Sequence, residues 1–329
     1  MRGQFPRRHL LGAGAASLAS SLATAARAAP QHRVRLGFVQ SGTLQWLLAV
    51  IRAQHLADSL RLDLQTVKLS DTNAARVALT GGSADVVMSD WLFAAARSAA
   101  GVPLRFAPLC SALGGVMVPA GSPIRGLADL PGRRLGVAGG GSDKSWLMVQ
   151  AAARQAGIAD LAAALQGGGP VYGAPALLSA RLQRGELDAV LTFWNFAVRL
   201  QVAGYREAVA VSACAQALGL PERPALVGLV FRADWAAQNG PAMGALLSAL
   251  RAAAALLAGP AEQSEPAWAA ARPLMDAADP VLFAALRQHF LAGLADPPSP
   301  ALLHLQATKL LAALQSGVSL PPGLFWQGS

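Results

Sequence analysis

The 329-residue chain has few of the residues that cross-linking and catalysis commonly use. Its only cysteines are Cys110 and Cys214, and it has five histidines. Two cysteines permit one disulfide or two buried free thiols, and a chain of this length does not need a covalent cross-link. No two histidines have metal-ligand spacing, and none falls in an expected strand-end loop. The sequence therefore offers little for a serine triad or a metal centre, and it contains no cofactor motif.

Charged residues are also scarce, at 14% of the chain. The basic residues are scattered rather than clustered, which argues against a nucleic-acid-binding stripe and a polybasic membrane patch. Beyond the first thirty residues, no uninterrupted apolar run approaches the roughly 20 residues that a membrane span needs. We therefore expect a soluble monomer that binds no nucleic acid.

The N-terminus, MRGQFPRRHLLGAGAASLASSLATAARAAP, has the features of an export signal. An Arg7-Arg8 pair precedes a mildly apolar run, and Ala26-Arg27-Ala28 fits an A-x-A cleavage site. The paired arginines favour the twin-arginine route, and an ordinary secretory signal is the alternative. Cleavage after Ala28 would remove four arginines and no acid, lowering the net charge from +9 to +5. The expected location is the periplasm.

Short apolar strands alternate with amphipathic helices along the rest of the chain, which predicts an α/β fold with mainly parallel sheets. The pattern stops near residue 219, after which the chain reads as helical and rich in alanine. Segments rich in proline and glycine, VPAGSPIRGLADLPG and GLPERP, mark two places where the chain could pass between lobes. The expected division is a signal peptide (1–28), a first lobe (29–118), a second lobe (119–218) and a return to the first lobe (219–329).

Two segments share one pattern, VALTGGSADVVMSDW (77–91) and RLQRGELDAVLTFWN (181–195). Each has a helix that ends in glycine, an apolar strand led by aspartate, and a polar/tryptophan pair after the strand. Two similar units suit two lobes of similar build. Ligands bind beyond the carboxyl ends of strands in such sheets, so these pairs are expected at the rim of a shared cleft.

The stretch GVAGGGSDKSW (136–146) joins an apolar strand to a helix, and three enzyme motifs fail on it. Asp143 stands where a phosphate-binding Walker loop needs glycine, and Lys144 stands where both a nucleophile elbow and a dinucleotide fingerprint need one. The remaining interpretation is a glycine turn and a helix N-terminus that present N–H donors to a bound group. Ser142 or Asp143 is expected to cap the helix.

The ordered set of motifs resembles the nitrate, sulfonate, taurine and thiamine-precursor group of ABC-transporter substrate-binding proteins. GLADLPGRRLGVAGGGS is similar to the segment that opens their second lobe, and LTGGSADVVMSD and LQRGELDAVLTFW are similar to their helix-to-strand joints. The resemblance implies a type II periplasmic binding fold, with two α/β lobes, a hinge and an interlobe ligand cleft. It also implies a small-molecule ligand that is delivered to an ABC permease in the inner membrane. From the failed motifs and the scarce histidines, we expect no catalysis, cofactor or metal.

Carried over onto this sequence, the resemblance predicts a cleft lined by loops of both lobes: Ser41, Gly42, Thr43, Asp90, Trp91, Cys110, Ser111, Gly140, Gly141, Ser142, Lys144, Ser145, Trp194 and Asn195. Lys144 is the only cation among these loops, whereas Asp90 and Asp143 are acidic. Two tryptophans with an aspartate would suit a flat or cationic molecule, and an anion is the alternative. Trp91 and Trp194 are expected to face the opposite lobe, or else to be core residues that follow strands.

Two other functions fit the same fold. One is an exported accessory protein that serves a neighbouring periplasmic enzyme. The other is an enzyme like the thiamine-pyrimidine synthases, which need histidine and cysteine in the pocket. The lack of histidines in the expected strand-end loops disfavours the enzyme.

Overall fold

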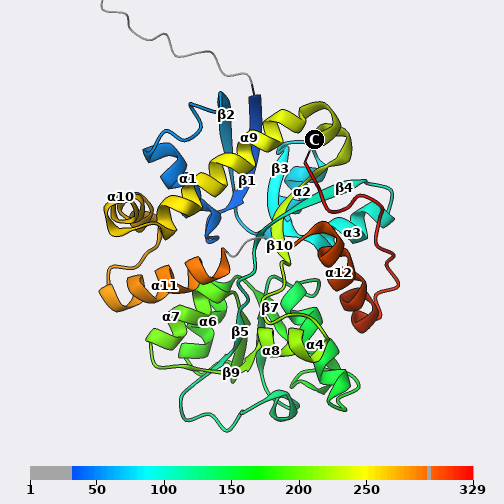
Figure 1. Ribbon diagram of the computed structural model, residues 1–329. Coiled ribbons are helices and arrows are strands. Elements are labelled where there is room, and N and C mark those ends of the chain that lie inside the picture. Colours follow the sequence, from blue (N-terminus) through cyan, green and yellow to red (C-terminus); the bar gives the residue numbers. More distant parts are fainter. Residues whose placement is uncertain (1–31, 295–297, 329) are drawn as a thin grey trace, which may run out of the picture.

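The computed structural model describes residues 32–294 and 298–328, so the predicted signal peptide lies outside the described residues. Two five-stranded sheets form two lobes, one above the other in Figure 1. The first sheet has the order β2-β1-β3-β10-β4: Leu62–Leu69, His32–Val39, Val86–Asp90, Val227–Arg232 and Leu104–Cys110. The second has the order β7-β6-β8-β5-β9: Val171–Gly173, Leu135–Ala138, Ala189–Thr192, Gly115–Val118 and Arg206–Ala210. The predicted α/β fold with two lobes is confirmed.

The two sheets follow the same plan. Three neighbouring strands are parallel, β2-β1-β3 in the first sheet and β7-β6-β8 in the second. The next strand is antiparallel to both of its neighbours and is the one that follows a crossing between lobes, β10 in the first sheet and β5 in the second. Each lobe thus receives a strand from chain that has just left the other lobe, and this exchange creates the hinge.

The chain crosses first between Cys110 and Gly115, and again between residues 217 and 227. The second sheet therefore begins at β5, a few residues before the boundary at 119 that the sequence predicts. The expectation that the chain is helical beyond residue 219 is wrong at β10, which lies between β3 and β4 in the first sheet.

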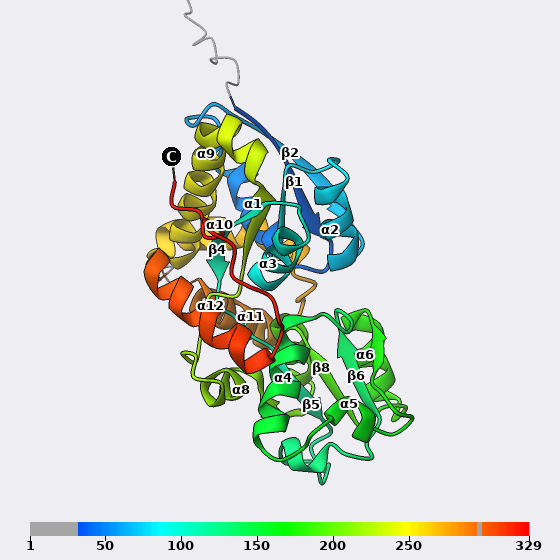
Figure 2. The same ribbon diagram turned by 90° about the vertical axis from the view of Figure 1, so that its right-hand side faces the viewer.

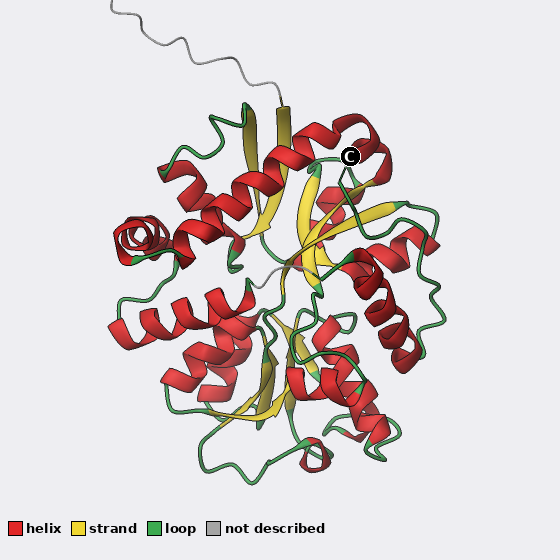
Figure 3. Ribbon diagram, viewed as in Figure 1, coloured by secondary structure: helices red, strands yellow, loops and turns green. Residues whose placement is uncertain are grey.

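Helices cover both sheets (Figure 3). Those of the first lobe are α1 (Leu44–Ala53), α2 (Thr72–Thr80), α3 (Trp91–Ala99), α9 (Ala233–Ala258) and α10 (Ala261–Ala271). Those of the second are α4 (Lys144–Gln155), α5 (Leu161–Ala164), α6 (Pro175–Gln183), α7 (Trp194–Val202) and α8 (Val211–Ala217). Two further helices touch the second lobe as well, since α11 (Pro280–Gly293) packs on α7 (Figure 1) and α12 (Pro300–Leu314) packs on α4 (Figure 2).

Helix α9 is long and apolar enough to cross a membrane by length and composition. In the structure it packs against β1, α1 and α10, and its apolar residues such as Met243, Leu246 and Leu250 have no exposed surface. Arg251 interrupts the apolar run on its exposed side. These contacts are those of a core helix of the first lobe.

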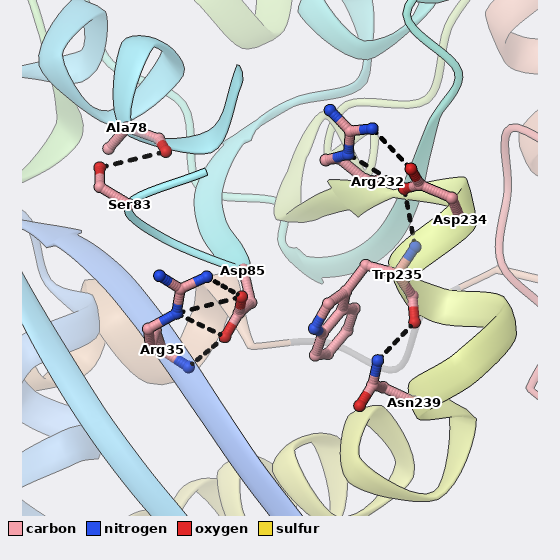
Figure 4. A network of polar contacts seen from close by, with 8 residues as sticks. All are labelled: Arg35, Ala78, Ser83, Asp85, Arg232, Asp234, Trp235 and Asn239. Atoms are coloured by element: carbon pink, nitrogen blue, oxygen red, sulfur yellow. Dashed lines mark hydrogen bonds and ion pairs between the residues drawn. The ribbon is translucent and has the colours of Figure 1, made fainter. Parts of the chain in front are cut away.

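One ion pair repeats at the same place in both lobes. Asp85, before β3, accepts a 2.8 Å hydrogen bond from the backbone N–H of Arg35 and pairs with its guanidinium (Figure 4). Asp188, before β8, accepts a bond of the same length from the N–H of Arg134 and pairs with that guanidinium. This pairing, chiefly the hydrogen bond from Arg134, holds the pKa of Asp188 below its ordinary value. The aspartates of the two similar sequence segments thus fix each helix-to-strand joint to the neighbouring strand.

Candidate functional site

A cavity of about 140 Å³ lies between the lobes, beyond the carboxyl ends of β1 and β3 and beside the glycine turn and α7. It brings together nine of the predicted site residues: Ser41, Gly42, Thr43, Asp90, Cys110, Lys144, Ser145, Trp194 and Asn195. Apolar side chains complete the wall: Val39, Leu44, Met88, Phe193 and Val227. The cavity is therefore apolar on its flanks and polar where the loops of the two lobes meet.

The first lobe contributes the turn between β1 and α1. Thr43 precedes α1 without making a side-chain cap, and the backbone N–H groups of Leu44 and Gln45 find no acceptor among the described residues. Free N–H groups at a helix N-terminus attract negative charge. This end of α1 is open toward the cavity because the turn from Ser41 to Leu44 lines it.

Helix α3 also begins at the cavity, but a carboxylate already occupies its N-terminus. Asp90 accepts a 2.8 Å hydrogen bond from the N–H of Phe93, and its other oxygen accepts a 2.9 Å bond from Nη2 of Arg76. The Asp90 side chain is 8% exposed and that of Arg76 14%. The charge of Asp90 is thus neutralised within the first lobe, which leaves it poorly suited to a cationic ligand.

The glycine turn of the second lobe presents a cation to the cavity. Gly139 has φ +88°, and a Cβ there would lie 2.8 Å from Oδ2 of Asp143, so this position requires glycine. Asp143 caps α4, accepting bonds from the N–H groups of Ser145 and Trp146. Nζ of Lys144 lies 4.0 Å from Asp143 and 5.7 Å from the centre of the Phe193 ring. Of the two predicted caps, Asp143 fills the role and Ser142 does not.

Helix α7 brings Trp194 and Asn195 across to the first lobe. The Asn195 amide donates a 3.2 Å hydrogen bond to the carbonyl of Ser41. The Trp194 ring lies 5.8 Å from that of Trp46 and 6.2 Å from that of Phe290. The backbone N–H groups of Trp194 and Asn195 find no acceptor among the described residues, and α7 has no side-chain cap. The site thus has one uncapped helix N-terminus from each lobe.

The structure places the other predicted site residues elsewhere. Trp91 is 3% exposed and packs edge-on against Phe325 in the core of the first lobe, because α3 turns its first side chain away from the cavity. Gly140 lines a neighbouring cavity of about 330 Å³ beside β7, and Ser111 lines one of about 180 Å³ at the hinge. Gly141 and Ser142 are exposed residues of the glycine turn that do not line this cavity, although the hydroxyl of Ser142 accepts a hydrogen bond from Arg76 of the first lobe.

Both cysteines are free thiols. Burial raises the pKa of the Cys110 thiol, although Lys144 and a backbone hydrogen bond oppose this effect. Burial also raises the pKa of Cys214, to about 11. A raised pKa suppresses the nucleophilic thiolate form, so the cavity thiol is a poor nucleophile.

Two contributors to the site were not predicted from the sequence. Ser89 lines the cavity, and its buried hydroxyl has no hydrogen-bond partner among the described residues. Arg76 lies on α2, fourteen residues before the carboxylate that it neutralises. The residues around Ser89 have the apolar pattern of a strand, and those around Arg76 have the pattern of a helix surface. Nothing in the neighbouring sequence marks either residue as part of a site.

Two lobes, each receiving a strand after a crossing, with a polar cavity between them define a type II periplasmic binding fold. The chain belongs to the NMT1/THI5-like family, whose model matches residues 60–263. No curated protein matches the sequence.

Solved structures share the fold at low sequence identity. The periplasmic aliphatic sulphonate binding protein SsuA of Escherichia coli is 20% identical with a TM-score of 0.69, and the match covers 91% of this chain and 93% of that one. The alkanesulfonate-binding protein SsuA of Xanthomonas axonopodis pv. citri, bound to MOPS, is 19% identical with a TM-score of 0.68, covering 91% and 99%. A Bordetella bronchiseptica protein is 20% identical with a TM-score of 0.71, covering 91% and 96%.

Proposed function

We propose that this protein is an exported solute-binding protein that captures a small organic anion between its lobes and delivers it to an ABC permease in the inner membrane. The family and the fold of the sulfonate-binding proteins support the solute-binding role. The predicted signal peptide supports export to the periplasm.

The observation that carries the anionic ligand is the set of donors at the cavity that make no hydrogen bond among the described residues. The two nearby carboxylates, Asp90 and Asp143, accept hydrogen bonds as helix N-caps, and Asp90 is also paired with Arg76. The remaining groups are donors: Nζ of Lys144, the N–H groups at the uncapped ends of α1 and α7, and the hydroxyl of Ser89. Donors from both lobes around one cavity favour an oxyanion, which would also draw the lobes together.

The apolar flanks of the cavity indicate that the ligand has a carbon skeleton as well as an acid group. Met88, Leu44 and the Phe193 ring border the space next to the donors. Of the two ligand types that the sequence left open, this favours the anion over the flat or cationic molecule, because Asp90 is paired with Arg76 and Trp91 is in the core. No histidine lines the cavity among the described residues, which favours binding over catalysis.

A thermal-shift comparison of matched ligands tests this proposal. The mature chain, in a buffer free of sulfonates, is heated with short alkanesulfonates and carboxylates and with alkylammonium ions of the same chain length. At a concentration 100 times its Kd, an anion should stabilise the fold by about 2.7 kcal/mol. The matched ammonium ion should give no shift. Shifts from ammonium ions alone, or from no member of either series, would contradict the proposal.

A further inference from the structure

The side chain of Arg76 joins the carboxylate at the cavity to the glycine turn of the opposite lobe. It lies on α2 of the first lobe, where Nη2 donates a 2.9 Å hydrogen bond to Asp90. Its Nη1 donates a 3.1 Å bond to the hydroxyl of Ser142, which belongs to the second lobe. One guanidinium thus bridges the two sides of the cleft.

The guanidinium is held from the first-lobe side before it meets the second lobe. Besides Asp90, the ring of Phe93 lies 4.8 Å from its central carbon, within the range of a cation–π contact. Because Asp90 and Phe93 both belong to the β3–α3 joint, these two contacts are independent of the position of the second lobe. The guanidinium is planar, and Asp90 holds one edge of it while the Phe93 ring covers one face. Its remaining N–H groups therefore point in a fixed direction.

The contact with Ser142 depends on the lobes being together. Ser142 lies in the turn between β6 and α4, which moves with the second sheet when the hinge opens. Asn195 makes a further bond across the cavity, to the carbonyl of Ser41, and Arg199 of α7 donates a 2.8 Å bond to the carbonyl of Asp276. These bonds join protein groups to one another, so they favour the closed arrangement whether or not a solute is bound.

We propose that Arg76 is the closure residue of the cleft, a positioning residue that neutralises Asp90 beside the ligand and locks the glycine turn of the second lobe against the first. The proposal rests on the proposed function, because it concerns the cleft in which the solute is captured. Closure by Arg76 places Lys144, two residues after Ser142, at the cavity wall. Arg76 therefore acts on the ligand through the position of another residue.

The test measures lobe closure by single-molecule fluorescence energy transfer without added solute. Dyes are placed at two exposed positions, one on each lobe, through Lys68→Cys and Gln183→Cys. Ser142→Ala removes the acceptor and leaves the Arg76–Asp90 pair intact. We expect it to lower the closed-to-open ratio about three- to tenfold, the range for one partly exposed charge-assisted hydrogen bond. Ser179→Ala is the matched control, since its hydroxyl bonds only within α6.

Arg76→Lys retains the charge beside Asp90 and loses the fork. We expect it to lower the closed-to-open ratio like Ser142→Ala, and the double variant to show no further loss, because both changes remove the same bond. Any of four results would overturn the proposal. These are an unchanged ratio in Ser142→Ala, an equal effect of Ser179→Ala, additive losses in the double variant, and no detectable closed population in the parent. A parent chain that closes in this way and yet binds no organic anion would contradict the proposed function instead.

Discussion

Replacement of Trp91 by alanine is expected to lower the free energy of unfolding by about 3–5 kcal/mol, the range for removing a large aromatic side chain from a core. Trp91 is 3% exposed and packs on Phe325, which the C-terminal segment brings back to the first lobe. That segment is held to β4 by hydrogen bonds between Phe106 and both Leu324 and Trp326. The affinity of the folded protein for an organic anion should change little, because Trp91 does not line the cavity. Chemical unfolding and a titration at low temperature measure the two quantities.

Trp194→Ala is the matched comparison, because this tryptophan also follows a central strand but lines the cavity. It should weaken binding by roughly 1–3 kcal/mol, the scale for losing an aromatic platform. Its contacts with Trp46 and Phe290 also give it a share in holding the lobes together. A Trp91→Ala protein with wild-type stability and a large loss of affinity would show that Trp91 faces the ligand after all.

Replacement of Lys144 by methionine is expected to weaken binding of an organic anion by about 1.5–3 kcal/mol, or roughly ten- to hundredfold. Methionine preserves most of the side-chain volume and removes the ammonium group that lines the cavity. The Lys144 side chain is only 13% exposed and the Asp143 carboxylate is 4.0 Å from its ammonium group. Water and internal pairing therefore compete only weakly with the acid group of a ligand for this ammonium group. Calorimetric titration provides the measurement.

The control is Lys309→Met, which removes the same charge from an exposed position on α12. It should leave affinity unchanged, since a distant exposed charge is screened by salt. Equal losses from the two variants would indicate a general effect of net charge. An unchanged affinity in Lys144→Met would show that the ammonium group does not contact the ligand.

The parts of the fold that follow local patterns could be predicted from the sequence. The helix-to-strand joints led by Asp85 and Asp188, and the apolar strand that meets a helix through the glycine turn at 136–146, follow from periodicity and turn residues. Strand β10 was not predicted because its short apolar run follows the proline-containing segment GLPERP and leads directly into alanine-rich helices. Its place depends on Gly228, where a Cβ would lie 2.1 Å from the carbonyl oxygen of Ala107, and such a neighbour is invisible in sequence.

The site was predictable to the level of its loops, and less so for individual side chains. The parallel strands of each sheet turn their carboxyl ends toward the cleft, which is why Asp90 after β3 and Asn195 after β8 reach the same cavity. The direction of Trp91 depends on how α3 packs and on the C-terminal segment that returns more than two hundred residues later. The partners of Asp90 also come from other elements, so its charge as seen by a ligand cannot be judged without Arg76. The sequence therefore left a flat or cationic molecule and an anion as alternatives, and the pairing of Asp90 with Arg76 favours the anion.

The most direct test of the central claim, that the interlobe cavity holds a small organic anion, is the structure of the mature chain with the sulfonate or carboxylate that gives the largest thermal shift. We predict acid oxygens within hydrogen-bonding distance of Nζ of Lys144 and of a backbone N–H at the start of α1 or α7, with the carbon skeleton against Phe193 and Met88. An acid group bound outside this cavity, or a ligand whose cationic group contacts Asp90, would contradict the claim.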